Sequence, residues 1–103
     1  MKRVYVCAEN FLEDNTKKCF TVEERKIMLV KKEGKFYATQ DVCTHAQASL
    51  SAGKLCGFEI ECPLHGAKFD IRSGEVTVLP AVKGLKVYQT EVDDGKVYVL
   101  FPE

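Results

Sequence analysis

The sequence lacks the features that mark nucleic-acid-binding and membrane proteins. Fifteen lysine and arginine side chains stand against fifteen aspartate and glutamate side chains, so the net charge is zero. Binding to a phosphate backbone usually requires a clear basic excess. No apolar run approaches the length of about 18 residues that a membrane-spanning helix needs. The composition therefore argues against nucleic-acid and membrane partners and, with 46% hydrophobic and 29% charged residues, is typical of a globular protein.

The sequence also lacks an even set of cysteines and any targeting segment. It has five cysteines, which makes a disulfide framework a poor prediction and favours metal binding. The first eleven residues begin with basic side chains but contain neither a long apolar stretch nor a small-residue cleavage site. We therefore expect a mature, cytoplasmic protein, and the length of 103 residues predicts a single domain over 1–103.

No long helical period appears in the sequence, whereas short runs rich in β-branched and aromatic residues recur. Glu33-Gly34 and Asp94-Gly95 are placed as hairpin turns between such runs. A further short strand pair is expected around Cys56-Gly57, and a helical turn within 9–17. The pattern predicts an all-β, antiparallel domain with strands at 3–7, 18–22, 26–32, 35–40, 75–79, 85–92 and 96–101.

Histidine is scarce, and both copies lie within three residues of a cysteine. Cys43-x-His45 is followed, after sixteen residues, by Cys62-x-x-His65. One alternative is that the cysteines are buried core residues and the histidines are hydrogen-bonded, with no metal. The arrangement of both histidines beside cysteines would then be a coincidence. A cysteine nucleophile needs a base and an orienting group, and would leave one pair without a role. A structural zinc site accepts two cysteines and two histidines, although zinc fingers usually pair cysteine with cysteine and histidine with histidine.

A Rieske 2Fe–2S centre fits the alternation of the two residue types, because two cysteine thiolates hold one iron and two histidines hold the other. The runs CTH at 43–45 and CPLHGAKFD at 62–70 closely resemble the Rieske motif, and the resemblance extends over nearly the full chain. It implies a small antiparallel Rieske domain whose cluster-binding subdomain is formed by two loops. It also implies one 2Fe–2S cluster, with the metal ligands Cys43, His45, Cys62 and His65.

Departures from the motif indicate which branch of the family the chain resembles. Respiratory Rieske proteins have an additional cysteine in each loop, joined by a disulfide, where this chain has Ala48 and Leu64. Oxygenase subunits need a second iron held by two histidines and a carboxylate, and this chain has no third histidine. The resemblance therefore implies the ferredoxin of a multicomponent aromatic-ring-hydroxylating dioxygenase. Such a ferredoxin is not itself an enzyme.

In that role the protein would pass single electrons from an NAD(P)H-dependent reductase to a terminal oxygenase. Two alternatives stay open at this point. One is a small Rieske subunit of another redox enzyme, such as nitrite reductase. The other is a Cys2His2 structural zinc module with no redox function.

The resemblance further implies which residues surround the cluster. Gly66 is expected to permit a positive φ or a close approach beside His65. High-potential respiratory Rieske proteins carry a serine and a tyrosine hydroxyl at the positions of Ala67 and Phe69. The side chains of Ala67 and Phe69 cannot donate hydrogen bonds. We therefore expect the reduction potential of this cluster to lie near the low end of the range of about −150 to +300 mV. The implied cluster-binding residues are Thr44, Gln47, Leu64, Gly66, Ala67, Phe69 and Pro80, the last within a proline loop.

The three remaining cysteines are not expected to bind the cluster. Cys7 and Cys19 fall in strand-like runs and are predicted to be small core residues. Cys56 stands in a predicted turn, where we expect it to be exposed.

Overall fold

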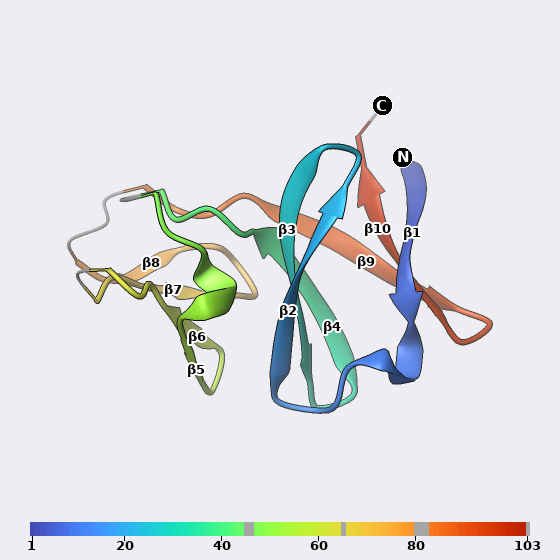
Figure 1. Cartoon of the computed structure of the whole chain (residues 1–103), viewed down its shortest axis with the longest axis horizontal. Coiled ribbons are helices and arrows are strands. Elements are labelled where there is room, and N and C mark those ends of the chain that lie inside the picture. The colour runs from blue at the N-terminus through green and yellow to red at the C-terminus, as the bar shows by residue number, and fades with distance from the viewer. Residues whose placement is uncertain (45–46, 65, 80–82, 103) are drawn as a thin grey trace.

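The computed structural model of the chain describes residues 1–44, 47–64, 66–79 and 83–102. Within these residues two antiparallel sheets form, one of six strands and one of four (Figure 1), which confirms the predicted antiparallel all-β fold. The strands are β1 (Lys2–Ala8), β2 (Thr16–Val22), β3 (Arg25–Lys32), β4 (Lys35–Gln40), β5 (Lys54–Cys56), β6 (Glu59–Glu61), β7 (Lys68–Asp70), β8 (Val76–Val78), β9 (Val87–Asp93) and β10 (Lys96–Phe101), and the 3-10 helices are η1 (Glu9–Phe11) and η2 (Leu50–Ala52).

The larger sheet has the strand order β1-β10-β9-β4-β3-β2, and tight turns join three of its neighbouring strand pairs. Positive φ at both central residues marks a type I′ hairpin turn. The β3–β4 turn has this form at Glu33 (φ 53) and Gly34 (φ 76), and the β9–β10 turn has it at Asp94 (φ 52) and Gly95 (φ 71). Both predicted hairpins are therefore confirmed.

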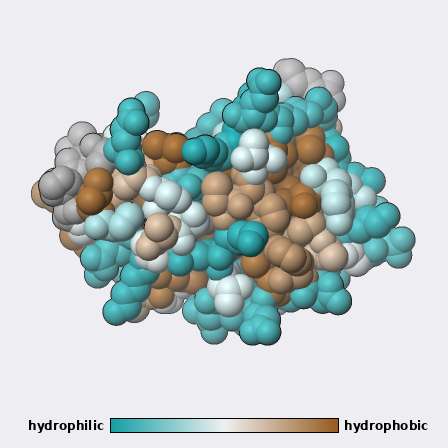
Figure 2. Space-filling view, viewed as in Figure 1, coloured by the Kyte–Doolittle hydropathy of each residue, from teal (hydrophilic) through white to brown (hydrophobic). Residues whose placement is uncertain are grey.

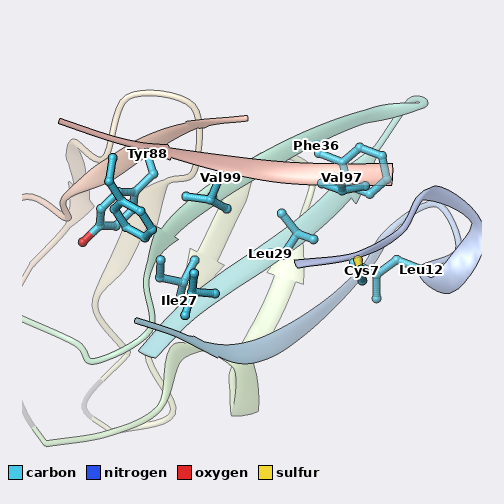
Figure 3. Close-up of a cluster of buried hydrophobic side chains, with 11 residues drawn as sticks. Cys7, Leu12, Ile27, Leu29, Phe36, Tyr88, Val97 and Val99 are labelled. Atoms are coloured by element: carbon cyan, nitrogen blue, oxygen red, sulfur yellow. The ribbon is translucent and has the colours of Figure 1, made fainter. Parts of the chain in front are cut away.

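Alternation of buried and exposed side chains builds the core of the six-stranded sheet. β10 buries Val97, Val99 and Phe101 and turns the intervening residues outwards. Figure 3 shows Leu29 and Val99 in the middle of this core, with Cys7 and Leu12 at one end and Tyr88 at the other. None of the buried residues of this cluster comes from the smaller sheet.

β3 differs from its neighbours because four consecutive residues in it are buried. Ile27 and Leu29 belong to the core of the six-stranded sheet, whereas Met28 and Val30 belong to a second apolar cluster shared with the smaller sheet. A strand that is buried on both faces carries a continuous apolar run. β3 therefore provides the surface on which the smaller sheet packs.

The smaller sheet has the order β5-β6-β7-β8, and each strand is three residues long. The expected strand pair around Cys56-Gly57 is confirmed as β5 and β6, with Gly57 at φ 61. Ile60 of β6 and Phe69 of β7 are paired and fully buried. The strands are too short to stabilise themselves, so their packing against β3 and the loops has to do so.

Close backbone approaches hold the smaller sheet to the segments around it. A Cβ atom at Gly53 would lie 1.8 Å from the Glu61 carbonyl oxygen, and one at Gly74 would lie 2.2 Å from the Leu85 carbonyl oxygen. The Leu85 N–H also donates to the Gly74 carbonyl at 2.7 Å. Glycine is needed at both positions because any side chain would push the two backbone segments apart.

The differences from the predicted elements lie mainly in this smaller region. The strands at 35–40 and 96–101 have the predicted bounds, but β7 and η2 were not predicted. β7 contains a single apolar residue, Phe69, which is too little to show alternation. The strand predicted to start at Leu85 begins at Val87, because Leu85 turns its N–H to Gly74 instead of to a sheet partner.

The cysteines predicted to lie outside the site fall in three environments. Cys7 is buried in the core and Cys56 is exposed, as predicted. Cys19 is only half-buried, and its thiol is hydrogen-bonded to the side chain of Asp41. Burial raises the pKa of the Cys19 thiol, and Asp41 raises it further.

In the part of the chain that the structure describes, no helix combines the length and the apolar character needed to span a bilayer. Figure 2 shows hydrophilic side chains around most of the outline, with hydrophobic residues over the six-stranded sheet and at the end that carries β5–β8. Leu64 and Leu79 are among the exposed large hydrophobic residues.

Candidate metal centre

The first predicted ligand segment leaves the end of β4 and turns back within ten residues. Cys43 is 4% exposed, and its backbone N–H donates to the carbonyl of Ala48 at 2.9 Å. Val42 and Ser49 form an isolated antiparallel bridge one step further out. These contacts close a narrow loop and hold the Cys43 side chain inside the protein.

The second predicted ligand segment follows β6 and has a similar closure. Cys62 is 1% exposed, and its N–H donates to the carbonyl of Ala67 at 2.7 Å. Gly66 has φ 72, which is the positive φ expected from the sequence. A left-handed residue at this place lets the chain reverse tightly and bring Ala67 back to Cys62.

The two closures bring the cysteines of the two loops together. The side chains of Cys43 and Cys62 interact, and both belong to the apolar cluster shared with β3. Burial raises the pKa of the Cys62 thiol; a hydrogen bond from the Leu64 N–H to the sulfur lowers it, and the neighbouring Cys43 raises it again. Two adjacent sulfurs with an N–H donor directed at one of them are well suited to bind a soft metal as thiolates.

This donor set fits the sulfur half of a 2Fe–2S centre. Each loop supplies one thiol, as the predicted pattern requires, and the surrounding side chains exclude water from both. A backbone N–H hydrogen bond to a ligand sulfur is also the kind of outer contact that supports such centres. His45 and His65, the two other predicted ligands, lie outside the described residues.

Of the residues predicted to surround the cluster in the first loop, Thr44 makes a specific contact. Its hydroxyl donates to the carbonyl of Lys83 at 2.6 Å, which ties the first loop to the segment that follows the predicted proline loop. Gln47 is exposed and lines a cavity of about 170 Å³ together with Lys26, Asp41 and Ser49. Pro80 lies outside the described residues.

The predicted residues in the second loop divide into an exposed and a buried group. Leu64 is 47% exposed, although its N–H points back to the Cys62 sulfur. Ala67 and Phe69 are fully buried in the same apolar cluster as the two cysteines. The side chains without hydroxyls therefore lie near the cysteines and not on the surface.

The prediction from sequence missed Asp41, which lies at the base of the first loop. Its side chain is 2% exposed and accepts hydrogen bonds from Ser49 and Ser51. The signal in the sequence is weak: an aspartate directly after a strand, two residues before a cysteine, followed by two serines. Such a pattern is also common in ordinary turns.

The family model for the Rieske [2Fe-2S] domain matches residues 2–89. The chain belongs to the Rieske [2Fe-2S] family. Its cofactor is therefore one Rieske-type 2Fe–2S cluster, and the structural zinc module is excluded. The pairing of Cys43 with Cys62 in the structure agrees with the two-thiolate half of such a cluster.

Ferredoxins of dioxygenases are among the proteins that this chain is similar to. The ferredoxin component of the naphthalene 1,2-dioxygenase system of Pseudomonas putida is 39% identical over 77% of this chain and 76% of that protein. The ferredoxin of carbazole 1,9a-dioxygenase from Nocardioides aromaticivorans superposes with a TM-score of 0.92 and 34% identity, over 96% of this chain and 97% of that one.

A third similar protein comes from a complex of reduced oxygenase and oxidized ferredoxin in carbazole 1,9a-dioxygenase. It superposes with a TM-score of 0.89 and 38% identity, over 94% of this chain and 100% of that one. The fold of this Rieske protein therefore matches that of a ferredoxin whose structure was solved in complex with an oxygenase.

Proposed function

We propose that this protein is the ferredoxin component of an aromatic-ring-hydroxylating dioxygenase system. It accepts one electron at a time from an NAD(P)H-dependent reductase and delivers it to a terminal oxygenase, and it does not transform a substrate itself. The observation that carries this proposal is the match along almost the whole length of a dioxygenase ferredoxin, at a TM-score of 0.92. The related complex with an oxygenase supports the choice of partner.

The proposed ligands are Cys43 and Cys62 for one iron and His45 and His65 for the other. The contact between the two buried thiols supports the first pair, and the motif supports the second. When bound, the cluster supplies a reversible one-electron carrier. The chain contributes a buried pocket for the two sulfurs, and the Leu64 N–H donates a hydrogen bond to the Cys62 sulfur. The other residues proposed to surround the cluster are Thr44, Gln47, Gly66, Ala67, Phe69 and Pro80.

Docking of the partners is proposed at the end of the molecule that carries the two loops. Val42 is 44% exposed and directly precedes Cys43, and Leu64 is 47% exposed and follows Cys62. Because the two cysteines meet, these apolar side chains flank the site from both loops. A small apolar surface suits the weak, rapidly exchanging contacts that a shuttling electron carrier needs.

We further propose that residues 1–103 form one domain and that the protein acts in the cytoplasm. The two sheets share an apolar cluster through β3, which supports a single folding unit. The chain has five cysteines, two of which are proposed metal ligands. An odd number of cysteines that serve metal binding and not disulfides is in keeping with a reducing compartment.

The proposal is tested first by the cluster and then by the partner. The purified protein should contain iron and acid-labile sulfide and give the EPR signal of a reduced Rieske centre. A His45→Ala variant should lose that signal, and retention of the wild-type signal would contradict the ligand set.

The second test mixes the chemically reduced protein with a terminal oxygenase of the carbazole or naphthalene type, without oxygen, and follows reoxidation by visible absorbance. Rapid reoxidation is expected. NAD(P)H-dependent hydroxylation is expected once a reductase, oxygen and the aromatic substrate of that oxygenase are added. Hydroxylation with a reductase but without an oxygenase would show that the chain has a catalytic site. A redox-active cluster that no such oxygenase reoxidises would favour a small subunit of another redox enzyme.

A further inference from the structure

A buried carboxylate lies at the base of the first cluster loop and is not explained by the ligand set. Asp41 follows β4 and is 2% exposed. Aspartate is rarely buried to this extent unless its oxygens are bound. The partners that the structure records for its side chain are the Ser49 hydroxyl, the Ser51 N–H and the Cys19 thiol.

These contacts join the two ends of the loop that carries Cys43. One oxygen of the Asp41 carboxylate accepts from the Ser49 hydroxyl, and the other accepts from the Ser51 N–H at 2.9 Å. The Asp41 carbonyl accepts from the Leu50 N–H at 2.7 Å as well. One residue therefore holds the outgoing strand and the returning segment together at three points.

The base of the loop is also fixed to the six-stranded sheet. The Asp41 N–H donates to the carbonyl of Lys26 at 3.0 Å, and the Cys19 thiol contacts the Asp41 side chain from β2. Further along, the Cys43 N–H reaches the Ala48 carbonyl. The hydrogen bonds thus form a continuous series from the sheet through Asp41 to the cysteine.

We propose that Asp41 is a positioning residue for the cluster: its carboxylate closes the first loop, sets the position of the Cys43 sulfur, and places a negative charge close to the redox centre. The inference rests on the proposed ligand set. Both oxygens accept hydrogen bonds, as those of an ionised carboxylate do. A nearby negative charge in a poorly solvated place disfavours the reduced, more negative cluster, so Asp41 lowers the reduction potential.

The test uses the holoprotein and two variants at this position. Asp41→Asn keeps the volume but removes the charge and replaces one acceptor oxygen by a donor, so the potential measured by protein-film voltammetry should rise. Asp41→Ala removes all three side-chain contacts and should speed the loss of iron to a chelator by about tenfold, the lower end of the effect of losing an outer contact on metal affinity.

Asp14→Asn is the matched control. Like Asp41, Asp14 accepts hydrogen bonds at both carboxylate oxygens, here from the N–H groups of Glu33 and Gly34, but it lies beside the β3–β4 turn of the six-stranded sheet. The Asp14→Asn variant should leave both the reduction potential of the cluster and the rate of iron release unchanged. If the Asp41 variants match this control in both measurements, the inference is wrong.

Two further outcomes keep the test decisive. If neither Asp41 variant folds, Ser49→Ala removes a single donor to the carboxylate, and faster release of iron from it supports the inference whereas an unchanged rate overturns it. If the wild-type protein itself binds no 2Fe–2S cluster, the proposed function fails. A normal wild-type cluster with unaffected variants overturns only the role of Asp41.

Discussion

The two sheets of this Rieske protein are stabilised in different ways. The strands of the larger sheet are six to eight residues long, share a core of their own and are joined in part by tight hairpin turns. Those of the smaller sheet are three residues long and rely on glycines that let backbones touch, on loop hydrogen bonds and on β3. The larger sheet therefore has a core of its own, whereas the smaller sheet and its loops depend on packing against the larger one.

This division separates stability from chemistry. The buried cysteines belong to the apolar cluster of the smaller region, whereas the core of the larger sheet contains neither of them. Changes in the two regions should consequently differ in kind: those in the larger sheet should lower the free energy of unfolding alone, and those in the smaller region should also alter the cluster.

Gly53→Ala should have the largest effect, because it acts where two backbones meet. The new Cβ would lie 1.8 Å from the Glu61 carbonyl oxygen, and that residue directly precedes Cys62. Overpacking commonly costs 1–3 kcal/mol, and contact with backbone instead of a flexible side chain puts the expected cost at roughly 3 kcal/mol or more. We expect a low yield of coloured holoprotein and destabilisation in urea.

Gly57→Ala is the matched control in the same sheet. Its Cβ would meet nothing within 4 Å, but its φ of 61 is unfavourable for alanine. The expected cost is about 1–2 kcal/mol, with normal incorporation of the cluster. If the two variants were equally stable and equally coloured, close approach would not be what holds the smaller sheet.

Leu29→Ala should destabilise the protein almost as much without affecting the cluster. Leu29 is fully buried in the core of the larger sheet, and a cavity at such a place costs about 2–5 kcal/mol. Urea unfolding should show this loss, while the EPR signal and the potential stay those of the wild type. A shifted potential would mean that the two regions are coupled through β3.

The contrast between the regions also explains what could be predicted from the sequence. Strand 96–101 alternates regularly and was predicted to the residue, since repeated local burial leaves a clear pattern. The strand containing Phe69 has no such pattern, because its position is set by Ile60 and by contacts far along the chain. Four metal ligands could be proposed from the sequence because the chemistry of such a centre restricts residue type and spacing, and that ligand set stays a prediction.

Asp41 shows why the rest of the site could not be predicted. Its partners, Ser49 and Ser51, are close in sequence, but the pattern does not reveal that the carboxylate is buried. The contact of Cys19 with the same side chain joins β2 to the segment after β4, which lies about twenty residues further along the chain. Burial and long-range contact are properties of the packed structure, and a single sequence contains no direct signal for them.

The double variant Ala67→Ser with Phe69→Tyr tests whether the smaller region controls the potential. Both side chains are fully buried beside the cysteines and neither donates a hydrogen bond. Hydroxyls that reach sulfurs of the cluster should raise the potential by on the order of tens of millivolts, within the known range of Rieske centres. A hydroxyl that finds no partner would instead cost about 1–3 kcal/mol in stability.

Ala38→Ser is the control for that variant, because Ala38 is fully buried in the core of the larger sheet. It should leave the potential unchanged in protein-film voltammetry. A wild-type potential well above zero at pH 7 would contradict the low-potential ferredoxin. If the double variant kept the wild-type potential, the hydroxyls would not reach the sulfurs in this loop.

The smallest expected effect is a gain in stability in the larger sheet. The β2–β3 turn places Glu23 (φ 48) and Glu24 (φ 67) in the left-handed region, where the two other hairpin turns of this sheet have glycine at the second position. A residue with a side chain pays roughly 1–2 kcal/mol for this conformation, whereas glycine does not. Glu24→Gly should therefore stabilise the protein, by about 0.5–1 kcal/mol after the greater chain entropy of unfolded glycine is allowed for.

Glu24→Ala removes the same charge but keeps the Cβ, and the ion pair of Glu23 with Lys2 is retained in both variants. Urea unfolding of the holoprotein should place the glycine variant above both the alanine variant and the wild type, with no change in the cluster. Equal stability of the two variants would show that the turn is not strained and that the larger sheet gains nothing from a better hairpin.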